Sequence, residues 1–167
     1  MSMLTRLRGL GRLLAITAAL GLPALAGAAD ANPGEHPIHQ IARTGTGDEV
    51  AAALKANPKA RDARTARGST PLHLAAMNSD LSAMRALIAA GADPNARDED
   101  GSTPLHLAAY ASRADNAQIL LEAGADPVAK NLYGRDPAAM GRKVKADEAV
   151  GIISLWILKG CQAGKPC

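Results

Sequence analysis

The nine-residue string GSTPLHLAA occurs twice in this chain, at positions 68–76 and again at positions 101–109. A second shared string, AGADP, follows each copy at the same offset, at positions 90–94 and 123–127. Self-similarity at a fixed period predicts a stack of similar units and not a globule around one core. A stack of this kind tends to present a long binding surface instead of a deep catalytic cleft.

Weaker copies flank the two strong ones. Four glycines begin the units, and the first interval between them is longer by one position than the other two: Gly34, Gly68, Gly101 and Gly134. The first unit therefore has one extra residue, which we place either within residues 44–48 or near Asn57 and Pro58. The outer units depart from the pattern, as terminal repeats must because one face meets water. A helix over residues 147–159, which includes Trp156, closes the last unit.

The repeated residues have local structural roles. Pro71 and Pro104 suit the first position of a helix, where no backbone N–H is needed. The preceding residues, Thr70 and Thr103, have hydroxyls that can cap free helical amides. The second helix of each strong unit is expected to end at a glycine with a positive φ: Gly91 and Gly124.

This pattern resembles the ankyrin repeat in its period, its Thr-Pro-Leu-His string and its Gly-Ala-Asp string. The resemblance covers about residues 32–159 and is strongest in the two central units. It implies an all-α solenoid of about four helix-turn-helix units with short β-hairpin-like turns. The domain would span residues 29–160, with units at about 31–64, 65–97, 98–130 and 131–160. In that pattern His73 and His106 lie inside the fold and bond to the turn and to the preceding threonine.

Residues 1–28 have the layout of a secretory signal peptide. A basic start is followed by an apolar stretch over residues 13–22 and by small residues with an A-x-A site at 26–28. We expect cleavage after Ala28 and a periplasmic or secreted protein without stable membrane insertion; an uncleaved anchor or a misassigned start are the alternatives. Exported bacterial ankyrin proteins, which this chain resembles, are associated with protecting other envelope proteins, including oxidative-stress enzymes.

The charge of the chain follows from this segment. The whole sequence has 19 Lys and Arg against 16 Asp and Glu, but three arginines and no acid lie in residues 1–28. The mature chain is therefore balanced, which gives no support for nucleic-acid binding. Aromatic residues are also scarce in the mature chain, so a platform for stacking bases is not expected: Tyr110, Tyr133 and Trp156.

Cys161 and Cys167, the only cysteines, lie in the C-terminal tail over residues 161–167. In an oxidising compartment they can close a small disulfide loop, which is the pairing we expect. Free or intermolecular thiols and a redox role are the alternatives, although catalytic pairs usually have CxxC spacing.

No catalytic or metal site is predicted. His73 and His106 recur one unit apart without convergent ligands, which makes a poor zinc site. Each histidine has a serine and threonine nearby, but two identical sets without a shared acid do not form a triad. The Asp98-Glu99-Asp100 string lacks the other ligands of a calcium loop. We therefore expect neither an enzyme nor a cofactor.

Binding residues are sought where the units differ. Three fingers project between units, over residues 64–69, 97–102 and 130–135, and their sequences are basic, acidic and apolar-aromatic respectively. The ends of the first helices also differ, with Met77 matching Tyr110. Tyrosine and arginine are typical interface anchors. We predict a partner-binding stripe of eight residues, each of which is otherwise an ordinary solvated turn residue: Arg67, Met77, Asp98, Asp100, Tyr110, Leu132, Tyr133 and Arg135.

The leading functional hypothesis is a monomeric, periplasmic protein-binding module that assists an envelope protein. An immunity-like inhibitor is an alternative, in which the acidic second finger would block a basic active site. A metal or small-ligand binder and a secreted effector are further alternatives. The ankyrin pattern indicates how binding is done, and not what is bound.

Overall fold

The computed structural model of the chain describes residues 35–163, which lie within one compact unit, Ala31–Cys167. The predicted signal peptide and Cys167 lie outside the described residues, so export and the disulfide of Cys161 stay predictions. The described part contains eight α-helices, one short 3-10 helix and no strand. The helices are α1 (Pro37–Thr44), α2 (Gly47–Ala56), η1 (Pro58–Asp62), α3 (Pro71–Ala75), α4 (Leu81–Ala89), α5 (Pro104–Tyr110), α6 (Ala114–Glu122), α7 (Pro137–Lys143) and α8 (Asp147–Lys159).

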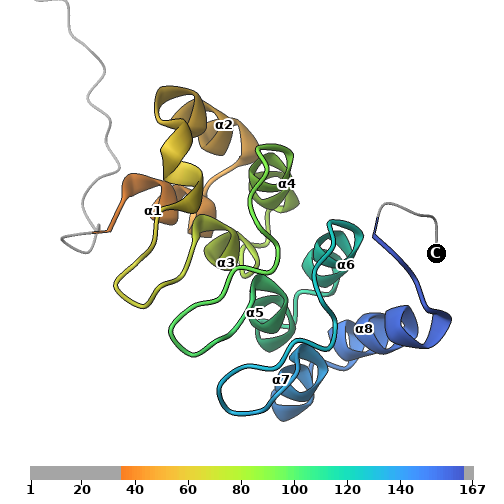
Figure 1. Cartoon of the computed structure of the whole chain (residues 1–167). Helices are drawn as coiled ribbons and strands as arrows, with labels where there is room; N and C mark the ends of the chain where they lie inside the picture. The colour runs from red at the N-terminus through yellow and green to blue at the C-terminus, as the bar shows by residue number, and fades with distance from the viewer. Residues whose placement is uncertain (1–34, 164–167) are drawn as a thin grey trace, which may run out of the picture. The chain divides into compact units, whose positions relative to one another are not determined.

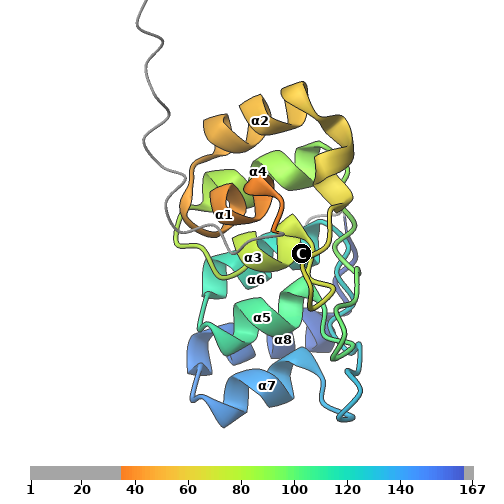
Figure 2. The same cartoon turned by 90° about the vertical axis from the view of Figure 1, so that its left-hand side faces the viewer.

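The α-helices form four antiparallel pairs that stack side by side in two layers (Figures 1 and 2). One layer holds α1, α3, α5 and α7, and the other holds α2, α4, α6 and α8. Each helix packs against its pair partner and against the equivalent helix of the next unit. This is the all-α solenoid that the repeat predicts. Among the described residues, no helix combines the length and apolar character needed to cross a bilayer.

Proline begins each helix of the layer that contains α1, at Pro37, Pro71, Pro104 and Pro137. The position suits proline because the first helical N–H has no partner within the helix. In α3 and α5 a histidine stands at the third position, where a capping box usually has Glu or Gln.

The turns depend on glycines in the left-handed region. Gly91 and Gly124, which follow α4 and α6, have φ of +82° and +97°, as the sequence predicts. Each finger is closed by a backbone bond across the turn, for example from the Asp98 N–H to the Ser102 carbonyl at 3.0 Å. Neighbouring fingers are also joined, because the Glu99 N–H donates to the Arg67 carbonyl and the Leu132 N–H donates to the Asp100 carbonyl. These bonds give hairpin-like turns without a strand.

The extra residue of the first unit lies after α2. The helices α1 and α2 begin ten residues apart, as α3 and α4 do, so the turn near residues 44–48 has ordinary length. The segment η1 instead replaces the Ala-Gly-Ala-Asp-Pro turn of the central units. The second of the two predicted places, near Asn57 and Pro58, is the correct one.

The core is one continuous cluster of small and branched side chains between the layers. Alanines in it allow close approach of neighbouring helices, while fully buried side chains such as Leu72, Leu87 and Leu105 fill the space between them. Trp156, 6% exposed, joins the same cluster from α8, so it belongs to the closing unit as the sequence predicts.

Two buried asparagines tie successive units together. The Asn78 amide donates to the Ala42 and Gly45 carbonyls at the end of α1. The Asn116 amide, on α6, lies 2.9–3.2 Å from the carbonyls of Ala75, Ala76 and Asn78. Carbonyls at the end of a helix have no partner within it, so these side chains satisfy groups that burial would otherwise leave unpaired.

Candidate binding groove

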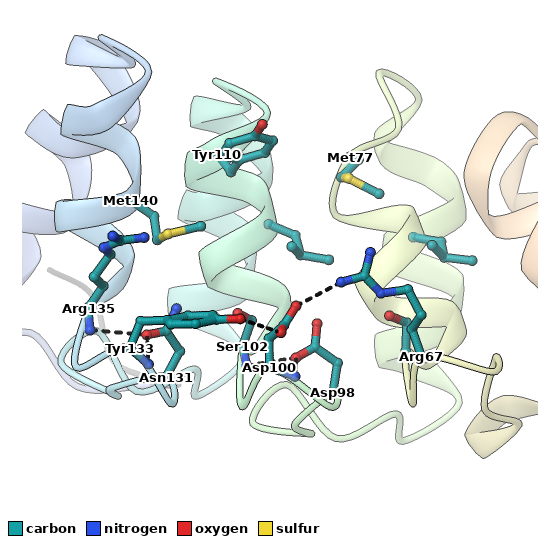
Figure 3. A pocket seen from close by; sticks show the side chains of 13 residues that line it. Arg67, Met77, Asp98, Asp100, Ser102, Tyr110, Asn131, Tyr133, Arg135 and Met140 are labelled. Atoms are coloured by element: carbon teal, nitrogen blue, oxygen red, sulfur yellow. Dashed lines mark hydrogen bonds and ion pairs between the residues drawn. The ribbon is translucent and has the colours of Figure 1, made fainter.

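A groove of about 430 Å³ runs between the three fingers and the helices α3, α5 and α7 (Figure 3). We call it the binding groove. Its thirteen lining residues occupy only five positions of the repeat, each seen in two or three units. In order of position, they are Arg67, Asp100 and Tyr133; Asp98 and Asn131; Ser69, Ser102 and Arg135; Leu74, Leu107 and Met140; and Met77 and Tyr110.

The first of these positions forms a chain of contacts across the fingers. Arg67 Nη2 lies 2.9 Å from Asp100 Oδ2, and the Tyr133 hydroxyl donates to Asp100 Oδ1 at 3.0 Å (Figure 3). The bond to this carboxylate raises the pKa of Tyr133. The basic first finger and acidic second finger are thus partners within the chain. An exposed ion pair of this kind contributes only about 0–1 kcal/mol, so it positions the fingers more than it stabilises them.

The second position serves the turn itself. Asp98 Oδ1 accepts bonds from the N–H groups of Asp100 and Ser102, at 3.0 and 2.8 Å. Asn131 Oδ1 accepts from Tyr133 and Arg135 in the same way, at 3.0 and 3.1 Å. Asp98, which the sequence suggests for partner binding, therefore has a structural role as well.

The helical side of the groove is apolar. Leu74, Leu107 and Met140 line it from α3, α5 and α7, with Met77 and Tyr110 above them (Figure 3). Tyr110 is the last residue of α5 and is 51% exposed. Met77 lies beyond the end of α3, because that helix stops two residues earlier than α5 or α7 in the repeat.

Arg135 lies at the end of the groove nearest α7. Its guanidinium carbon is 5.8 Å from the centre of the Tyr133 ring, a cation–π contact. It takes part in none of the four ion pairs found among residues 35–163.

Buried histidines hold the fingers to the helices. His73 Nδ1 accepts from the Thr70 N–H at 3.1 Å and contacts its hydroxyl at 2.9 Å, while Nε2 donates to the Ser102 carbonyl at 3.0 Å. His106 makes the same bonds to Thr103 and to the Arg135 carbonyl. These partners fix the neutral tautomer with the proton on Nε2, because an N–H and a carbonyl cannot exchange roles. Burial lowers the pKa of both histidines.

This geometry agrees with the structural role that the resemblance implies for His73 and His106. His39 repeats part of it in the first unit, with Nε2 3.0 Å from the Ala63 carbonyl. No group of three His, Cys, Asp or Glu side chains that could hold a metal is found in the described part of the chain.

Seven of the eight residues predicted for partner binding line the one groove. The exception is Leu132, which is 76% exposed but does not line it. Its Cγ instead lies near Gly101, 3.1 Å from where a Cβ on that glycine would stand. The lining residues that the sequence reading missed share repeat positions with those it chose, and this shared register was the available signal: Ser69, Ser102, Leu107, Asn131 and Met140, together with Leu74, which it placed in the core.

The groove offers hydrogen bonds and charges on its finger side and apolar contact on its helix side, as surfaces for protein recognition do. A family model described as ankyrin repeats (3 copies) matches the chain twice, at residues 19–98 and 38–131. These matches include both strong copies of the Thr-Pro-Leu-His string and extend over more than half of the chain. The chain therefore belongs to the ankyrin-repeat family, and its repeats indicate a module for protein–protein interaction.

Proposed function

We propose that this chain is a protein-binding module of the bacterial periplasm that holds an envelope protein in the binding groove and protects or assists it, for example under stress. The observation that carries the proposal is the convergence on one groove of seven of the eight residues predicted for partner binding. Those residues lie at positions of the repeat where the units differ, which leaves them free to recognise a partner.

The location is supported by the N-terminal segment over residues 1–28. Its basic start, apolar stretch and A-x-A site have the layout of a cleaved signal peptide. We expect the protein isolated from the periplasmic fraction to begin at Ala29, as measured by intact mass spectrometry. An uncleaved chain found in the cytoplasmic fraction would contradict the proposed location.

Tyr110 and Tyr133 are the residues that we expect to matter most for binding. They are 51% and 64% exposed, so neither is needed by the core. Truncating an interface tyrosine commonly weakens binding by about 1–2 kcal/mol, which is roughly five- to thirtyfold in affinity. We expect Tyr110→Ala and Tyr133→Ala each to reduce the amount of partner recovered after crosslinking in the native envelope fraction.

Leu158→Ala is the matched control. Leu158 is an exposed apolar residue on α8, 82% exposed and outside the groove. The far-ultraviolet circular dichroism of all three variants should match that of the unmodified protein. Equal recovery of the partner by the tyrosine variants, with intact folding, would remove the groove from the interface.

A further inference from the structure

The binding groove contains one carboxylate whose charge the fold does not need. The turn of the second finger uses only Oδ1 of Asp98, as an acceptor for two N–H groups. The neutral Asn131 does the same work in the third finger, and the hydroxyl of Thr65 accepts the Ser69 N–H in the first. An asparagine would therefore suffice at position 98, and the negative charge is a surplus.

No basic side chain of the described residues neutralises this charge through an ion pair. Asp98 is absent from the four ion pairs, and the nearest finger arginine, Arg67, is paired with Asp100. Arg64 and Arg97 instead donate to backbone carbonyls of the fingers. His73 and His106, which interact electrostatically with Asp98, are held neutral by their hydrogen bonds. The half-buried carboxylate is thus open to a cation from outside the chain.

The surroundings of Asp98 suit a cation on a long aliphatic chain. Leu74, Leu107 and Met77 line the same groove, with the Tyr110 ring at its upper edge (Figure 3). Lysine and arginine place their methylene groups on apolar surfaces while their charged ends reach a polar partner. An exposed tyrosine ring adds a favourable contact for the same charge.

Arg135 supplies the opposite charge one unit further along. It has no ion pair among the described residues, and it lines the groove beside Tyr133. Equivalent positions in packed helical units are roughly 10 Å apart. An extended chain covers that distance in about three residues. A bound segment that meets both Asp98 and Arg135 would thus have its basic and acidic residues about three positions apart.

We propose that the binding groove binds an extended protein segment that presents a lysine or arginine to Asp98 and an acidic side chain to Arg135. This inference rests on the proposed function and names the chemistry of its partner. Opposite charges placed at two points fix the register of the segment along the units, whereas the apolar side of the groove accepts a range of side chains.

The test is selection of a phage-displayed library of random fourteen-residue peptides on three forms of the purified protein. These are the unmodified protein, Asp98→Asn and Asp126→Asn. The Asn at position 98 keeps the turn acceptor, as Asn131 does, and removes only the charge. Asp126 is the matched control, because its Oδ1 also accepts a turn N–H, from Val128, but it lies outside the groove.

We expect peptides enriched on the unmodified protein and on Asp126→Asn to carry Lys or Arg about three residues from Asp or Glu. Asp98→Asn should lose the basic preference, and it should bind synthetic copies of the enriched peptides about three- to tenfold more weakly by fluorescence anisotropy. Arg135→Gln should lose the acidic preference in the same selection. Equal basic enrichment on Asp98→Asn, or no charged enrichment on any form, would overturn the inference.

These outcomes are separable from failure of the proposed function. If the envelope partner is captured through the tyrosines but the enriched peptides show no dependence on Asp98, the inference is wrong and the module remains. If the peptides depend on Asp98 but no envelope protein is recovered, the groove chemistry holds and the periplasmic role is wrong.

Discussion

At the scale of single residues, two side chains have a backbone conformation that favours glycine. Ser112 and Lys145, which follow α5 and α7 at equivalent places of successive units, have φ of 56° and 58°. In the left-handed region the Cβ atom crowds the carbonyl of its own peptide, which costs about 1–2 kcal/mol for a residue other than glycine. Both residues are exposed, so this cost is not offset by packing.

We therefore expect Ser112→Gly and Lys145→Gly each to raise the free energy of unfolding by about 0.5–1 kcal/mol, a gain smaller than the steric cost because glycine also adds freedom to the unfolded chain. Urea unfolding followed by circular dichroism measures it. Ser112→Ala, which removes the hydroxyl but keeps the Cβ, should show no gain, and a similar gain for that control would contradict the conformational explanation.

The buried histidines make stability depend on pH. Burial holds the pKa of His73 and His106 below 6.5 in the folded state, so the unfolded chain binds protons more readily. Stability is then fully present above about pH 6.5, and it falls as the pH drops below that value toward the folded pKa.

The expected result is a lower urea midpoint at about pH 5.5 than at about pH 7.5. His106→Gln is the matched variant, because glutamine at this position can accept the Thr103 N–H as in a capping box but does not titrate. It should be less stable at neutral pH and less sensitive to acid. An equal loss in acid for both proteins would exclude His106 as a source of the effect.

At the scale of helices, the end of α3 depends on a side chain from another unit. The buried Asn116 amide reaches three carbonyls there, including those of Ala76 and Asn78. These contacts lie where α3 ends, two residues short of the corresponding end of α5. The position of Met77 in the binding groove thus depends on α6, and not on the local sequence alone.

We expect Asn116→Ala to lower the free energy of unfolding by about 2–3 kcal/mol, because buried carbonyls lose their only side-chain donor. Asn95→Ala provides the comparison. Asn95 also joins two units, through the Gly124 carbonyl and the Asp126 N–H, but its bonds are exposed and water can replace them. The comparison variant should lose about 1 kcal/mol or less, and equal losses would show that burial is not the cause.

At the scale of the whole stack, each unit is stabilised by its neighbours. The helix α8 packs on α6 and α7 and has no further unit beyond it in the described residues. A terminal unit supported on one side is the first to open in a stack of this kind. Trp156, the only tryptophan, lies in this unit and therefore reports on it.

Ile153→Ala tests this arrangement. Ile153 is fully buried on α8, and its truncation should cost about 2–4 kcal/mol. We expect Trp156 fluorescence to change at a lower urea concentration than the circular dichroism of the variant, because the last unit opens before the rest. Coincident transitions in the variant would show that the four units unfold as one.

The sequence by itself determined the number of units, their helices and the roles of the repeated proline, histidine and glycine residues. It could do so because these features are local and recur; the last helix, residues 147–159, lies where its apolar spacing predicts. The tertiary structure alone decided which unlike residues meet. Arg67, Asp100 and Tyr133 join across three fingers, while Leu132, adjacent to one of them, lies outside the groove. A repeat identifies equivalent positions, but the contact between units depends on how each finger directs its side chains once the units are stacked.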